Sequence, residues 1–430
     1  MNKILHLPFS VRLINKAVRL SAETKSILAF GCFEGFLGAY HAKEEIKALR
    51  MANWAILRKH YLCRFDKNKR YKDFFLNLTD FVNTGTEEKK TSPLKNALNP
   101  LIRKLSYSEC WSLYEYFRYF GDFRIAYYLR KSLLKRSIDK QMTSKFIFSL
   151  DGINAAFELG FTDEISEILT KKALSPFISS KLDEANAYFA LLNGDKDKAY
   201  KIWSKTFDKN DHKYLDMLKG SDVAVVGPAA SDLDSGKEID QSDCVIRTNY
   251  RVGSNQPYEM FGKRTDVAYY NQYRINQKWD ETSRALNGLE WVIAKSQKDE
   301  LKVRKLKKQI NVRSSFVPHT NFFQTSAPMG IIVALGDILR FQPSNVKVYS
   351  TSFYCSKQTY SQNYKSTDTG RALVSSDLRI HEPFSQFAYA KHLFDRNIIS
   401  ADSLTSDVLK IEGHKYSRSL QSLYGRYTAV

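Results

Sequence analysis

The sequence predicts an α/β protein, with an all-α region over residues 1–215 and a mostly parallel sheet with helices over residues 216–430. Two observations predict it. Before residue 220, apolar residues recur at helical spacing and β-branched runs are few. After residue 220, short buried strands alternate with helical segments, which is the order typical of a parallel sheet.

Three glycines punctuate the helical region. Gly121, Gly160 and Gly194 each follow a helical pattern, and a small or aliphatic residue stands five positions later, where a second helix would pack closely. They lie 39 and 34 residues apart, near the period of a helical-hairpin repeat. The region therefore looks like tetratricopeptide-type repeats, and an irregular bundle of similar hairpins is the alternative. Either would serve as a scaffold or dock a partner.

The second half contains six predicted strands and two clear helices. Each strand is a short apolar run that ends at a turn or polar residue, which predicts burial on both faces of a sheet. The strands fall at residues 222–227, 243–247, 266–270, 289–294, 311–317 and 346–349, and the helices at 329–341 and 384–394. In such sheets, ligands bind outside the carboxyl ends of the strands.

Composition narrows the class of protein. With 43% hydrophobic residues, the chain can bury enough apolar surface to fold, and no apolar run reaches the roughly 20 residues that span a bilayer. The five cysteines form no CxxC pair and no metal-ligand spacing, so a reducing compartment is expected. Because the first residues lack the pattern of a signal peptide, we expect a cytoplasmic protein.

The net charge of +20 suggests an anionic partner. The sequence carries no zinc-finger, RNP-type or basic-zipper pattern, so no nucleic acid is expected. A solvated basic face is the simplest interpretation. The alternatives are a peripheral position on the anionic inner face of the cytoplasmic membrane, or contact with an anionic polymer.

Polar residues follow the first two strands of the sheet. Residues 227–236, which include Gly227 and Ser231, form a small-residue turn that would let backbone amides approach a phosphate or sugar, although it has neither a GxGxxG nor a P-loop pattern. Arg247 and Asn249 end the second strand and should project where this turn projects. The alternative for these two is a salt bridge and a turn-capping Asn.

Several of these segments together resemble the large motif of the sialyltransferase family that carries large, small and very small sialyl motifs. The resembling segments are residues 223–227, 235–236, 239–240, 245–249 and 262–266. Further along, residues 325–332 resemble the small motif and residues 381–386 the very small motif. The chain departs from the family at Pro228 and Ala327, which stand where the family has Asn and Gly, and at Gln386, where it has Glu. With these departures, the chain resembles a distant bacterial relative of this sialyltransferase family.

The resemblance implies a Rossmann-like domain, a variant of the GT-A-like glycosyltransferase fold, that uses a CMP-activated sugar and no metal or other cofactor. His381 would be the general base, with Glu382 as its competitor for that role. The donor would contact Gly227, Ser231, Arg247, Asn249, His319, Thr325 and Ser326. Asp232 and Asp234 form a DxD pattern, which we interpret as turn residues because the family needs no metal.

The function expected from these features is transfer of an ulosonic acid, sialic acid or Kdo, from a CMP donor to a saccharide or glycolipid acceptor. The product would belong to a bacterial capsule or lipopolysaccharide, and other polysaccharide-assembly proteins would be partners. The donor sugar, the linkage and the inverting or retaining outcome stay open. The rival from another class is an inactive helical-repeat scaffold that binds polysaccharide or partner proteins.

Overall fold

The computed structural model describes the chain from residue 107 onward, with gaps. The described residues are 107, 110, 111, 114, 118, 121, 123–144, 146–147, 150–171, 173–174, 179–230, 233–251, 257–306, 310–315, 328–356, 378 and 381–425. Expectations for residues 1–106 lie outside them.

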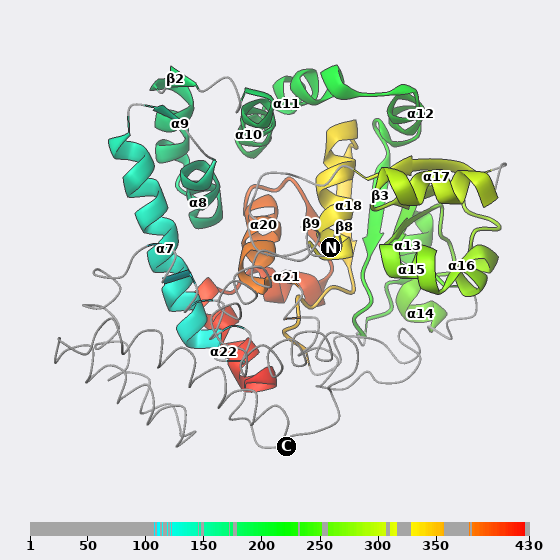
Figure 1. Ribbon diagram of the computed structural model, residues 1–430. Helices are drawn as coiled ribbons and strands as arrows, with labels where there is room; N and C mark the ends of the chain where they lie inside the picture. The colour runs from blue at the N-terminus through cyan, green and yellow to red at the C-terminus, as the bar shows by residue number, and fades with distance from the viewer. Residues whose placement is uncertain are drawn as a thin grey trace, which may run out of the picture.

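Within these residues, the predicted α/β part contains a seven-stranded, all-parallel sheet in the order β7-β6-β5-β4-β3-β8-β9 (Figure 1). The strands are β3 (Asp222–Val226), β4 (Cys244–Thr248), β5 (Val267–Tyr270), β6 (Trp291–Ala294), β7 (Asn311–Ser314), β8 (Asn345–Tyr349) and β9 (Ser400–Ala401). The expectation of a Rossmann-like parallel sheet is confirmed. Each of the six predicted strands is present, and β9 is too short for a sequence pattern to reveal.

Helices cover both faces of the sheet because residues alternate along each strand between two apolar clusters. One face packs on α13 (Gly236–Gln241), α14 (Tyr258–Phe261), α15 (Gln272–Gln277), α16 (Trp279–Ala285) and α17 (Gln297–Leu306). The other packs on α12 (Lys209–Leu218), α18 (Gly330–Ile338) and the 3₁₀ turn η6 (Leu339–Phe341). Beyond α18 lie α20 (Pro383–Asp395), α21 (Ser403–Leu409) and α22 (Gly413–Tyr424).

The first half is helical over its described length, apart from two two-residue strands. It contains α7 (Phe123–Thr143), α8 (Asp151–Leu159), α9 (Thr162–Lys171), α10 (Ser179–Leu192), α11 (Lys196–Trp203), the 3₁₀ turn η5 (Ser204–Thr206), β1 (Phe146–Ile147) and β2 (Ala173–Leu174). Gly121, Gly160 and Gly194 all have the expected positive φ, of 80°, 74° and 81°. The residues five positions after them, Ala126, Ile165 and Ala199, are buried. The predicted helical turns are therefore present.

The two halves share one hydrophobic core within the described residues. In Figure 1, α20 lies between α18 and the helices of the first half, and α8 contacts it directly. Tyr188 of α10 stacks on Tyr389 of α20 with ring centroids 5.3 Å apart, and Arg396 donates to the carbonyl of Leu192 at 3.0 Å. The described helices of the first half therefore pack against α20 and support it.

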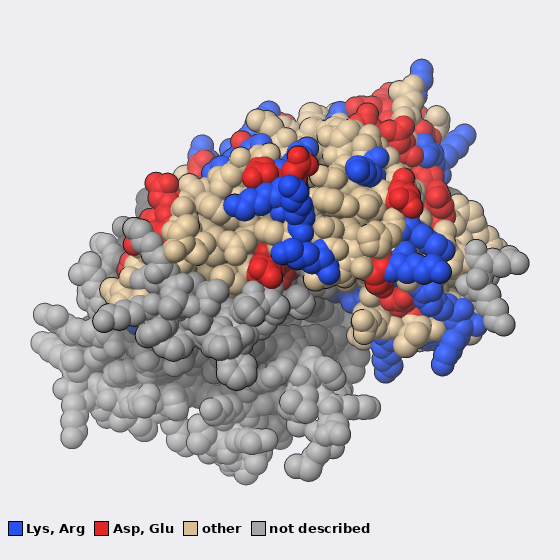
Figure 2. Space-filling view, turned by 90° about the horizontal axis from the view of Figure 1, so that it is seen from above, with Lys and Arg blue, Asp and Glu red and all other residues tan. Residues whose placement is uncertain are grey.

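Two surface properties bear on partners. On the face seen in Figure 2, Lys and Arg side chains stand in small groups separated by Asp, Glu and uncharged residues. Among the described residues, no helix combines the length and the apolar character needed to cross a membrane.

Candidate functional site

The strand order reverses its direction between β3 and β8. The chain runs outward from β3 through β4, β5 and β6 to β7, and then returns to form β8 on the other side of β3. Ligands of open parallel sheets bind outside the carboxyl ends of the strands at such a switch point. The ends of β3 and β8 therefore define the candidate site.

Gly227 allows these two strand ends to approach closely. Its N–H donates to the carbonyl of Tyr349 at 2.8 Å. A Cβ at this position would lie 2.2 Å from Thr351 Oγ1 and 2.5 Å from the carbonyl oxygen of Ser350, so only glycine fits. A packing reason thus accounts for Gly227, and its contact with a donor stays a prediction.

Strained backbone gathers at this edge of the sheet. Asn249, Ser350, Phe353 and Tyr354 have positive φ values of 52°, 50°, 45° and 65°. Such residues cost about 1–3 kcal/mol each and cluster at ligand sites, where the surrounding structure holds them in place. Here Asp402 accepts the N–H of Ser350 at 2.7 Å, and the Asn249 N–H donates to the Tyr269 carbonyl at 2.7 Å.

Two hydroxyls after β8 are buried without a partner among the described residues. Ser350 and Ser352 are 0% and 2% exposed, and their Oγ atoms make no hydrogen bond there. A buried hydroxyl without a partner costs free energy unless a ligand or water supplies one. A water or a ligand atom would be needed to satisfy these two hydroxyls.

Arg247 does not point where the sequence suggested. Its guanidinium donates to Thr265 Oγ1 at 2.9 Å and to the carbonyl of Phe261, so it holds the loop between α14 and β5. The side chain is buried, and this burial lowers its pKa to about 10. Arg247 is therefore a structural residue in this geometry, held by hydrogen bonds to a hydroxyl and a carbonyl and not by the salt bridge that the sequence suggested.

Asn249 lies at the carboxyl edge, apart from Arg247. Its Oδ1 accepts the N–H of Asn271 at 3.1 Å, which joins the ends of β4 and β5. Asn271 in turn caps α15 by accepting the N–H of Arg274 at 2.9 Å. Asn249 is half-buried, and its donor-binding role stays a prediction.

The starts of α18 and α20 meet beside this edge. A Cβ on Gly330, the first residue of α18, would lie 3.1 Å from Thr248 Cβ, so the helix begins against the end of β4. Gln386 of α20 accepts the N–H of Met329, which precedes Gly330, at 2.5 Å. The segments around Asn249, Met329 and His381 therefore lie in one region, although up to 132 positions separate Asn249 from His381.

Glu382 is the N-cap of α20 and is fully buried. Its carboxylate accepts the N–H groups of Phe384 and Ser385, at 3.0 and 2.7 Å, and the hydroxyls of Ser385 and Tyr114, both at 2.5 Å. Burial opposes ionisation, but Arg130 at 3.5 Å and these hydrogen bonds hold the pKa of Glu382 below its usual value. A carboxylate so fully engaged is a cap, and the geometry speaks against its competing role as a base. His381, the residue before it, is half-buried, and its role as general base stays a prediction.

The remaining sequence-predicted residues fall outside the described part of the chain. These are Ser231, His319, Thr325 and Ser326, and Asp232 of the DxD pattern. Asp234 is exposed. Among the described residues, no three His, Cys, Asp or Glu side chains gather as a metal site would require.

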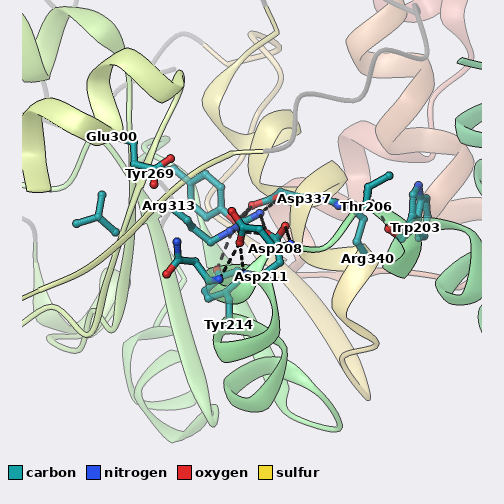
Figure 3. Close-up of polar contacts among 12 residues, drawn as sticks. Trp203, Thr206, Asp208, Asp211, Tyr214, Tyr269, Glu300, Arg313, Asp337 and Arg340 are labelled. Carbon is teal, nitrogen blue, oxygen red and sulfur yellow. Dashed lines mark hydrogen bonds and ion pairs between the residues drawn. The ribbon is translucent and has the colours of Figure 1, made fainter. Parts of the chain in front are cut away.

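A cluster of charged side chains lies on the α18 face of the sheet, and its members pair with one another. Arg313 of β7 lies between two carboxylates (Figure 3), with 2.6 Å to Asp211 and 2.5 Å to Asp337. Asp337 also accepts the hydroxyl of Tyr269 at 2.7 Å. The cluster ties α12, α18, β5 and β7 together, and its groups are occupied by one another, so we assign it a structural role.

Sequence reasoning missed three residues at the edge. Gln386 joins α18 to α20, Asp402 holds Ser350, and Lys295 follows β6 with its Nζ 3.1 Å from the carbonyl of Pro328. Lys295 carried the same signal as Arg247 and Asn249, a polar residue at the end of a buried strand. Gln386 and Asp402 gave none, because their partners are distant in sequence.

Comparisons of the chain with protein-family models, with curated proteins and with solved structures gave no match.

Proposed function

We propose that the chain is a glycosyltransferase that moves an ulosonic acid from a CMP-activated donor to a saccharide acceptor. One observation carries the proposal. The three segments that resemble the large, small and very small sialyl motifs are distant in sequence but adjacent in the structure beside the carboxyl end of β4, through Gly330 against Thr248 and Gln386 against Met329. An assembled site of this kind supports a common ligand for the three segments.

The proposed reaction is a substitution at the anomeric carbon of the sugar. The bond from that carbon to the phosphate oxygen of CMP breaks, and the electron pair leaves with CMP. A bond from the acceptor oxygen to the anomeric carbon forms, and the acceptor proton passes to the imidazole of His381. Hydroxyls and backbone amides at the start of α18 suit the developing charge on the phosphate.

The site residues divide into two groups under this proposal. His381 acts on the acceptor, whereas Gly227 and Asn249 would contact the donor. The same role is proposed from the sequence for Ser231, His319, Thr325 and Ser326, which lie outside the described residues. Glu382 fixes the start of α20 and so positions His381, which is consistent with its four hydrogen bonds. In the cell, we propose a cytoplasmic enzyme at the membrane face where surface polysaccharide is assembled.

The test is CMP release by the purified full-length protein from CMP-Neu5Ac and from CMP-Kdo, with and without saccharide acceptors. We expect one donor to be consumed and to raise the melting temperature. His381→Ala should transfer sugar at least about a hundredfold more slowly while binding CMP normally, because the proton comes from the acceptor. His414, exposed on α22, gives the matched control His414→Ala.

The outcomes separate the proposal from its rival. Binding of polysaccharide without donor binding or turnover would favour the inactive scaffold. Transfer at the wild-type rate by His381→Ala would remove that residue from the mechanism without removing the function.

A further inference from the structure

Lys295 is placed where a ligand at the carboxyl edge would meet it. It is the first residue after β6, and its Nζ donates to the carbonyl of Pro328 at 3.1 Å. Pro328 comes two residues before the start of α18, so the ammonium lies beside the start of this helix.

The ammonium has no counter-ion among the described residues. Its one hydrogen-bond partner among the described residues is a neutral carbonyl, and burial alone lowers its pKa to about 8. The charged groups on the surrounding elements are engaged elsewhere: Asp299 of α17 accepts from Ser296 and Asn276, Arg313 of β7 pairs with Asp337 of α18, and Arg274 of α15 pairs with Glu281. Lys295 is half-buried, and a cation partly removed from water without a counter-ion costs free energy, so an anionic ligand would stabilise it here.

The adjoining sequence supplies no counter-ion either. Residues 316–327, which connect β7 to Pro328, contain no Asp and no Glu. An anion for Lys295 therefore cannot come from this connection.

A second polar atom without a partner lies on the next strand. The Ser315 N–H donates to the carbonyl of Ala294 at 2.7 Å, so Ser315 is next to Lys295 across the ladder. The Ser315 Oγ is buried and makes no hydrogen bond with the described residues. Because side chains alternate along strands, Lys295 and Ser315 both fall on the α18 face, as Ile293 and Arg313 do.

We propose that Lys295, assisted by Ser315, binds an oxyanion of the substrate at the carboxyl edge of the sheet. The inference rests on the proposed function for the identity of the substrate. The oxyanion is then the phosphate of CMP or the carboxylate of the ulosonic acid, and both offer oxygens that an ammonium and a hydroxyl can bind.

The experiment compares the wild type with Lys295→Met, Lys295→Arg and the control Lys298→Met, which changes an exposed lysine on α17. Titration calorimetry at pH 7 measures the Kd of cytidine, CMP, CMP-Neu5Ac and CMP-Kdo. We expect Lys295→Met to weaken oxyanion binding at least tenfold and to leave cytidine unchanged. Loss of CMP assigns the phosphate, and loss confined to the CMP-sugars assigns the carboxylate.

A pH series adds a readout that a merely structural role would not move. Above about pH 8 the free ammonium loses its proton, so the Kd of the oxyanion ligand should rise for the wild type and stay level for Lys295→Arg. Equal Kd values for the wild type and Lys295→Met, with both CMP and the CMP-sugars, would overturn the inference and leave the proposed function intact.

Failure of the proposed function is recognised separately. If the wild type binds no CMP compound, inorganic phosphate is the probe. Thermal stabilisation by phosphate that Lys295→Met abolishes would still support the oxyanion site, and its absence in the wild type would overturn it.

Discussion

The side-chain amide oxygen of Gln386, on α20, accepts a hydrogen bond from the backbone N–H of Met329, at the start of α18, at 2.5 Å. The amide nitrogen of the same side chain donates to the carbonyl of Glu382 at 2.8 Å. The residue must therefore accept and donate at once, which an ionised Glu cannot do. This explains in physical terms why Gln stands where the resembling family has Glu.

Gln386→Leu should lower the free energy of unfolding by about 1–3 kcal/mol, because it leaves the N–H of Met329 and the carbonyl of Glu382 without this partner. Gln386→Glu should also destabilise, since it places a carboxylate in a fully buried position beside Glu382. Urea denaturation measures both changes. Gln277→Leu, at an exposed position of α15, should stay within about 0.5 kcal/mol of wild type. A wild-type denaturation midpoint for both Gln386 variants would show that the two hydrogen bonds of this side chain contribute nothing to stability.

The sequence predicted the sheet well because each strand is a short buried run between turns. It placed β3 to β6 and β8 within two residues of their bounds, and only the end of β7 was set three residues too late. The side-chain directions at the edge were less predictable. Because side chains alternate along a strand, positions 247 and 249 should lie on one side. Arg247 is still within β4, and its side chain reaches the end of α14, whereas Asn249 lies beyond the strand and has a φ of 52°. The contacts of Gln386 and Glu382 depend on tertiary packing, which no local pattern reports.

Gly227→Ala should disrupt the switch point. The added Cβ would meet the Ser350 carbonyl oxygen and Thr351 Oγ1, so the ends of β3 and β8 must separate. We expect a lower melting temperature together with weaker CMP binding, measured by thermal shift and calorimetry. Thr351→Ala added to the variant removes one of the two clashes and should restore stability only in part, because the backbone oxygen stays. Full recovery in the double variant would show that Thr351 alone limits this position.

His392 should make stability depend on pH. Burial lowers its pKa, and its Nε2 lies 3.2 Å from the carbonyl oxygen of Glu158. Below about pH 6.5 the unfolded chain binds a proton that the folded state excludes. The free energy of unfolding therefore decreases as the pH falls, by at most about 1.4 kcal/mol per pH unit. His392→Gln should flatten this part of the curve between pH 7 and 5, whereas His414→Gln, at an exposed position, should keep it. A slope that His392→Gln leaves unchanged must come from other groups.

Lys295→Met should stabilise the ligand-free protein at pH 7 while it weakens oxyanion binding. The variant replaces a half-buried ammonium with an apolar side chain of similar length, and the lost hydrogen bond to Pro328 offsets part of the gain. The sign of the pH dependence follows from the two pKa values. Between about 8 in the folded state and about 10.4 in the unfolded state, the unfolded chain binds more protons, so wild-type stability rises with pH in this window. The stability advantage of Lys295→Met over wild type should therefore be largest at pH 7 and shrink toward pH 10.

Urea denaturation across this range measures this difference, with Lys298→Met as the variant whose difference from wild type should not change with pH. If Lys295→Met is less stable than wild type at pH 7, the ammonium supports the fold itself, and a ligand is no longer needed to explain its burial.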